Sequence, residues 1–157
     1  KFYGDGRSLE QYLAMESGCV TKMLTRAAPL AACLAMPMSP TRNEVDEAKL
    51  RLQTGFSFIG ITDHWHLSIC LFNVMFKQAC RSFQFSNSRP TIGENSSAYD
   101  TAVLRGYRDP YDNELFDLAV KLFEASLKKH ILSESSCEWC WREAQVLPER
   151  GFGRRGL

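Results

Sequence analysis

The side chains best suited to bind an anion lie in a polar stretch at residues 83–99. Arg89 carries a planar guanidinium that fits phosphate oxygens, and Ser88 and Thr91 place neutral hydroxyl donors beside it. The stretch is rich in Ser, Asn, Gly and Pro, as loops are, and loops of this length often carry function. The residues thus indicate a candidate phosphate site, with an ordinary surface loop as the simpler interpretation.

Two other groups of reactive side chains favour structural roles. His64 and His66 are two residues apart, so they do not share a helical face and could not bind one metal ion together from a helix. Four carboxylates cluster where a helix is expected to begin, and there they stabilise the helix dipole more readily than they form a catalytic pair: Asp109, Asp112, Glu114 and Asp117. No complete nucleotide-binding, esterase or zinc-protease motif occurs in the chain.

The six cysteines leave several interpretations open. Cys137 and Cys140 form a single C-x-x-C pair, whereas structural zinc needs four ligands, and His130 lies outside the usual spacing. Disulfides in an oxidising compartment, or simple packing, are the alternatives. Cys70 lies within a helical pattern, where we expect a small buried hydrophobic side chain.

Composition indicates a globular protein without a strong electrostatic preference for partners. The chain has 157 residues, 45% of them hydrophobic and 24% charged, with a net charge of +1. This balance argues against nucleic acid as a partner, and no apolar run approaches the ~20 residues that span a bilayer. We expect residues 1–157 to form a single partial domain of a longer protein, with any membrane anchor upstream.

A buried strand followed directly by a helix is the clearest local pattern. Residues 56–61 are aromatic and β-branched after a glycine, which predicts a strand. Thr62 and Asp63 can cap a helix, and the next apolar residues share one helical face: Trp65, Ile69, Phe72 and Phe76. A strand that leads into such a helix is typical of α/β proteins.

Further helices are expected on both sides of this unit. Residues 27–35 are a small-residue helix candidate, and residues 43–52 a better one that Asn43 could cap. Asp109 as N-cap, with Pro110 at the first helical position, begins the strongest helix in the chain.

Four segments, in order, resemble one family. Residues 58–72 (FIGITDHWHLSICLF) resemble the FVG(V/I)TE-x-W-x-x-S(V/I)CLF unit of Golgi-type carbohydrate sulfotransferases, the group that includes heparan sulfate 2-O-sulfotransferase and algal and protist relatives. Residues 18–25 (GCVTKMLT) are similar to a GCQTKMLTG segment upstream of that unit. Residues 87–91 (NSRPT) are similar to its Arg-containing loop, and residues 109–119 (DPYDNELFDLA) to its D-x-x-D-x-x-L(Y/F)-x-x-A helix. The match covers roughly residues 15–130, and residues 131–157 form a C-terminal tail.

The resemblance implies the C-terminal part of a P-loop-like α/β fold, mostly helical here with one central buried strand. It implies transfer of a sulfuryl group from 3′-phosphoadenosine 5′-phosphosulfate (PAPS) to a carbohydrate hydroxyl, without a metal. The family's phosphosulfate loop and catalytic base belong to an N-terminal half, so no catalytic residue is assigned and this polypeptide alone is expected to be inactive. By resemblance, Arg89, Thr91 and Ser88 contact the nucleotide, and Lys22 lines the acceptor side.

The family also implies a location in the Golgi lumen, with the parent protein anchored as a type II membrane protein. Departures from the pattern bear on the acceptor: Val20 replaces Gln, Arg26 replaces Gly, and His64 and His66 stand where acidic or neutral residues are commoner. Two alternatives stay open: a non-catalytic remnant that binds a protein or glycan, and a small α-rich domain whose Cys137 and Cys140 bind metal.

Overall fold

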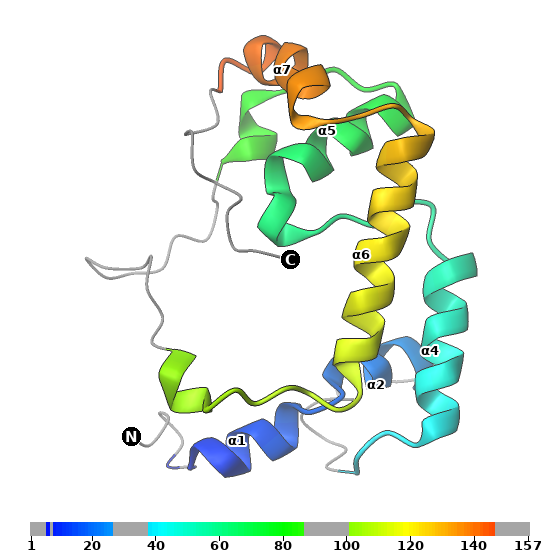
Figure 1. Cartoon of the computed structure of the whole chain (residues 1–157), viewed down its shortest axis with the longest axis vertical. Helices are drawn as coiled ribbons and strands as arrows, with labels where there is room; N and C mark the ends of the chain where they lie inside the picture. Colours follow the sequence, from blue (N-terminus) through cyan, green and yellow to red (C-terminus); the bar gives the residue numbers. More distant parts are fainter. Residues whose placement is uncertain (1–5, 7, 27–37, 87–100, 147–157) are drawn as a thin grey trace. The chain divides into compact units, whose positions relative to one another are not determined.

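The computed structural model describes residues 6, 8–26, 38–86 and 101–146, and these residues are helical with no β-strand among them (Figure 1). They divide into two compact units, described separately below. Unit 1 holds residues 1–57 and 107–118, and unit 2 holds residues 58–106 and 119–157. The α-helices are α1 (Leu9–Glu16), α2 (Cys19–Thr25), α4 (Arg42–Thr54), α5 (Trp65–Phe76), α6 (Asp112–Lys129) and α7 (Glu134–Glu143). Short 3₁₀ helices are η1 (Thr62–His64), η2 (Ser82–Phe85) and η3 (Thr101–Leu104).

The predicted α/β class, with a central buried strand at residues 56–61, is wrong for the described part of the chain. A strand needs a neighbouring strand to pair its backbone N–H and C=O groups, and none lies in the described residues. A side chain does part of this pairing instead. The Ser68 hydroxyl accepts the Ile61 N–H at 2.9 Å and donates to the Ile61 carbonyl at 3.0 Å. The segment is therefore irregular chain that leads into η1, and the buried Ser68 fixes its last residue, Ile61, to α5.

Unit 1 is built from capped helices around a small apolar cluster. Ser8 caps α1 and Thr41 caps α4, each within a reciprocal capping box that satisfies the first backbone amides. Thr41 thus takes the capping role predicted for Asn43, and α4 begins one residue before Asn43. Val45 and Ala48 of α4 are buried against Leu115 of α6. Residues 27–35, the other helix candidate here, lie outside the described residues.

Ion pairs tie α4 to its neighbours within unit 1. Glu44 accepts a hydrogen bond from Arg26 Nε at 2.7 Å, and Glu114 pairs with Arg42 and Lys49. The hydrogen bond from Arg26, joined by one from the Thr41 amide, lowers the pKa of Glu44 to about 2. Hydrogen bonds from Arg42 and Lys49 lower the pKa of Glu114 to about 2 as well.

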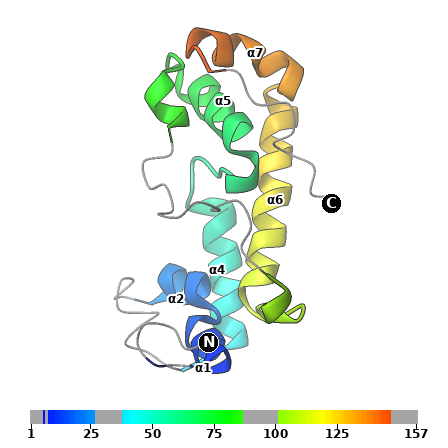
Figure 2. The ribbon, with the colours of Figure 1, turned by 90° about the vertical axis from the view of Figure 1, so that its left-hand side faces the viewer.

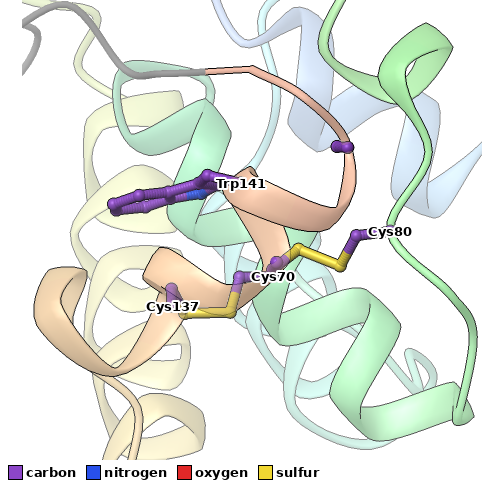
Figure 3. Packing of buried hydrophobic residues seen from close by; sticks show 6 residues of the cluster. Cys70, Cys80, Cys137 and Trp141 are labelled. Carbon is purple, nitrogen blue, oxygen red and sulfur yellow. A yellow bond between two sulfur atoms is a disulfide. The ribbon is translucent and has the colours of Figure 1, made fainter.

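Two disulfides hold α7 in unit 2. Cys137 is bonded to Cys70 of α5, and Cys140 is bonded to Cys80 in the segment after α5. Figures 1 and 2 show α7 beside α5, and Figure 3 shows the yellow sulfur bonds that join them, with Trp141 on the same helix. All four cysteines are buried. Cys70 is therefore a cross-link rather than only a packed thiol, and Cys137 and Cys140 cannot be the zinc ligands of the metal-binding alternative.

The apolar face predicted for α5 is largely the exposed one. Trp65, Phe72 and Phe76 are each about two-fifths exposed, whereas the buried positions of α5 are Ser68, Cys70, Leu71 and Asn73. The disulfide and two buried polar side chains fix this orientation. The Asn73 amide exchanges two hydrogen bonds of 3.0 Å with the Gln84 amide, which anchors η2 to α5.

Removing one disulfide should destabilise unit 2. Replacing both cysteines of the Cys70–Cys137 bond by alanine opens a link across 67 residues, and the loss of a native disulfide of this kind costs about 2–5 kcal/mol of unfolding free energy. Denaturant unfolding followed by circular dichroism measures the change. Ser82→Ala, at an exposed position of η2, is the control and should leave stability unchanged. Equal stability of the double variant and the parent would contradict this role.

The Glu44 pair should stabilise the protein only when the carboxylate is ionised. Because folding lowers the pKa of Glu44 from 4.5 to about 2, its contribution is complete above pH 4.5 and is lost as the pH falls toward 2. Glu44→Gln should therefore be less stable than the parent at pH 7, and the difference should shrink between pH 4.5 and 2. Thermal unfolding across this range tests it, with the exposed Glu124→Gln as control. A difference that does not change with pH would contradict the ion pair.

Candidate functional site

The candidate site is the place in unit 1 where α2 meets the start of α6. Gly18, which precedes α2, donates its backbone N–H to Asp109 Oδ2 at 2.8 Å. The other oxygen of Asp109 accepts the backbone N–H groups of Tyr111 and Asp112 at 2.8 and 2.9 Å. Asp109 therefore accepts amides at the entry to α6, as predicted for a cap, and at the same time holds the entry to α2. The helix itself begins at Asp112, not at Pro110 as predicted.

Asp112 accepts three hydrogen bonds from the first turn of α2. Its Oδ2 accepts the Val20 N–H at 2.8 Å, and its Oδ1 accepts the Thr21 N–H at 2.9 Å and the Thr21 hydroxyl at 2.7 Å. The first amides of a helix have no partner within the helix, and α2 has no side-chain cap of its own. The Asp112 carboxylate, from the first residue of α6, supplies what a local N-cap residue normally would.

Gly18 is the residue type that this junction requires. Its φ is +66°, in the left-handed region that L side chains rarely adopt. A Cβ at this position would lie 2.3 Å from Cγ of Pro40, so a larger residue would also collide with its neighbour. The glycine of the GCVTK segment therefore lets the backbone pass close to Pro40.

The junction favours the ionised form of Asp109. Partial burial alone would raise its pKa, but hydrogen bonds from the amides of Asp112, Gly18 and Tyr111 outweigh burial and lower the pKa. Asp109 serves the start of the long helix, as predicted for the acidic cluster, because it accepts the amides of Tyr111 and Asp112. The bonds of Asp112 go to α2 instead. Sequence reasoning missed the bonds to α2, because no local pattern shows which distant amides a carboxylate will bind.

Lys22 is the one predicted site residue that the structure describes. It lies on α2, its side chain has no solvent exposure, and it is the largest fully buried side chain of the described residues. In that part of the chain, its Nζ is also the only buried side-chain nitrogen or oxygen without a hydrogen-bond partner. Lysine is almost never fully buried unless it is paired. Arg89, Thr91 and Ser88 lie outside the described residues, so their predicted nucleotide contacts stay predictions.

His64 and His66 of unit 2 have packing roles. His64 stacks on Phe123, with ring centroids 6.1 Å apart. His66 stacks on Phe85 at 5.3 Å and meets the edge of Trp141, and burial lowers its pKa. Among the described residues, no group of three or more His, Cys, Asp or Glu side chains is placed to hold a metal ion.

Unit 2 also carries a groove of about 630 Å³ with an aromatic lining. Phe72 and Phe76 of α5 form one side with their rings 4.8 Å apart, and Phe83 and Arg81 contribute from the η2 region. Phe83 is 74% exposed. Apolar rings beside a guanidinium could hold a sugar or an acidic peptide, so the groove is a second surface that could bind a ligand.

Comparisons with family models, curated proteins and solved structures gave no match to this chain. None of the described helices is both long and apolar enough to cross a membrane.

Removing the Asp112 carboxylate should loosen α2. Asp112→Ala leaves the amides of Val20 and Thr21 without their acceptor, and the loss of such a cap costs about 2 kcal/mol of unfolding free energy. Asp117→Ala, at an exposed position of the same helix, should change stability by less than about 0.5 kcal/mol. Urea unfolding of the two variants measures the difference. Equal effects of the two substitutions would show that Asp112 does not hold α2.

Proposed function

We propose that the chain is the C-terminal portion of a sulfotransferase that moves a sulfuryl group from PAPS to a carbohydrate hydroxyl. The junction in unit 1 carries this proposal. Residues 18–25 and residues 109–119 each resemble a segment of the carbohydrate sulfotransferases, and they are directly bonded through Asp109 and Asp112. Segments that resemble one family and also assemble into one site are better support than the same matches scattered over the chain.

The disulfides support the proposed location in the Golgi lumen. Disulfides form and persist in oxidising compartments, and they are rare in the cytosol. The bonds at Cys70–Cys137 and Cys80–Cys140 join buried cysteines at the centre of an apolar cluster in unit 2. A protein that depends on them fits a secretory compartment, where glycans are also modified.

The proposed roles of individual residues follow from the resemblance and from charge. Arg89, with Thr91 and Ser88, would hold a phosphate of the nucleotide through a forked guanidinium and hydroxyl donors. Lys22 would face the acceptor. In-line attack of a sugar hydroxyl on sulfur would also need a base and donors to the leaving phosphate, which we assign to the N-terminal half of the parent enzyme.

A non-catalytic protein that binds a glycan or a protein is the second candidate. The aromatic groove of unit 2 favours it, because exposed rings beside Arg81 can contact a ligand without any catalytic group. Nucleotide binding separates the two candidates, since only the transferase requires PAPS.

The transferase proposal makes a paired prediction about activity and binding. Residues 1–157 alone, incubated with labelled PAPS and a panel of glycans, should give no transfer above blank. A longer protein that includes the residues encoded upstream of residue 1 should bind adenosine 3′,5′-bisphosphate. In that protein, Arg89→Ala should raise the Kd for this nucleotide at least tenfold, which corresponds to about 1.4 kcal/mol of binding free energy. Calorimetric titration measures both affinities.

Arg142→Ala is the matched control, because Arg142 is an exposed residue of α7 that pairs with Glu138 in its own helix. It should leave nucleotide binding unchanged. Transfer by residues 1–157 alone would contradict the assignment of the catalytic groups to the N-terminal half. Failure of the extended protein to bind the nucleotide would favour the non-catalytic candidate.

A further inference from the structure

The unsatisfied ammonium of Lys22 is the strongest sign of a missing ligand in the described structure. A buried polar group without a partner costs free energy, and a buried charge costs far more unless it is paired. Lys22 is fully buried, and its Nζ has no partner among the residues described. The fold therefore buries the Lys22 side-chain nitrogen in a place where no group of the described chain accepts a hydrogen bond from it.

The carboxylates at the junction of unit 1 already serve other donors. Asp112 is used by Val20 and Thr21, and Asp109 by Gly18 and the first amides of α6. The remaining carboxylates that link elements of this unit are also engaged: Glu44 with Arg26, and Glu114 with Arg42 and Lys49.

The same bonds exclude the start of α2 as the anion site. An anion at a helix N-terminus would need free backbone N–H groups, but those of Val20 and Thr21 donate to Asp112. The Thr21 hydroxyl donates to Asp112 too. An incoming anion would thus be held by the ammonium of Lys22, which offers three donors and one positive charge.

We propose that Lys22 is the centre of a binding site for a singly charged oxyanion, namely a carboxylate or a sulfate ester. One negative charge neutralises the buried ammonium, whereas a phosphate monoester dianion would leave an unpaired charge in the interior. A single ammonium also lacks the forked geometry that favours bidentate phosphate binding. This inference deepens the acceptor role of Lys22 and rests on the proposed function for its biological meaning, but its test uses binding alone.

The complete burial of Lys22 predicts how the anion arrives. Because the ammonium has no solvent exposure, a ligand reaches it only when the covering residues open locally. The observed association rate should therefore rise with ligand concentration and then reach a plateau set by the opening rate.

Thermal unfolding in the presence of small ligands tests the site in the whole chain. Glucuronate supplies the carboxylate, glucose 6-sulfate the sulfate ester, glucose 6-phosphate the dianion and glucose the neutral control, all at constant ionic strength. At one hundred times its Kd, a monoanion should raise the unfolding midpoint of the parent protein by about 5–10 °C. Glucose should leave it unchanged, and glucose 6-phosphate should act more weakly than the monoanions.

Lys22→Met keeps a long side chain and removes the charge. Without ligand, this variant should unfold about 2–4 °C above the parent, because an uncompensated buried charge is gone, and monoanions should no longer shift it. Lys121→Met, at an exposed position of α6, should behave like the parent.

The outcomes separate this proposal from the transferase proposal. A shift with glucuronate, with glucose 6-sulfate or with both supports the site and identifies its ligand class, whether or not sulfuryl transfer is ever found. If neither compound shifts the parent, or if both shift Lys22→Met equally, the site is wrong. A larger shift with glucose 6-phosphate would overturn the single-charge argument. Should Lys22→Met not fold, the ligand series on the parent protein still decides the question.

Discussion

The hydrogen bonds from the backbone of α2 to Asp109 and Asp112 are the constraint on which unit 1 depends. A helix of seven residues is too short to be stable by itself in water. Here two of its first amides donate to Asp112, and the preceding Gly18 donates to Asp109, each bond spanning more than 90 residues of sequence. Because these bonds fix both the start and the rotation of α2, they also decide that Lys22 faces the interior. The lack of a hydrogen-bond partner at Lys22 Nζ thus follows from the junction.

Two disulfide bonds stabilise unit 2. Its helix α7 has only ten residues, and two of its cysteines are bonded to the α5 region. This arrangement turns α5 so that Ser68, Asn73 and Cys70 point inward, while its aromatic side chains line an open groove. Several exposed rings on a helix without Asp, Glu, Lys or Arg are unusual on a protein surface that binds nothing. They give unit 2 a surface that can receive a ligand or a partner.

Features determined by neighbouring residues could be predicted from the sequence, and features determined by distant residues could not. The last long helix and its cap at Asp109 were predictable, because capping and an apolar stripe are local patterns. The prediction of a strand at residues 56–61 was wrong, because a short apolar run has the same sequence pattern whether or not another strand pairs with it. The Ser68 hydroxyl pairs with the backbone of Ile61 instead of a neighbouring strand, and no rule of residue spacing predicts such a bond. The disulfide pairing of Cys70 and Cys80, and the missing partner of Lys22, likewise depend on which segments meet in space.

The amides of Gly18, Val20 and Thr21, which donate to Asp109 and Asp112, can be observed one by one. Amide hydrogen exchange followed by NMR reports each of these three bonds separately. We expect all three amides to exchange far more slowly than in an unstructured peptide. We also expect Asp112→Ala to remove the protection of Val20 and Thr21 while leaving α4 protected. Exchange of the three amides at unprotected rates in the parent protein, with α4 protected, would contradict these hydrogen bonds.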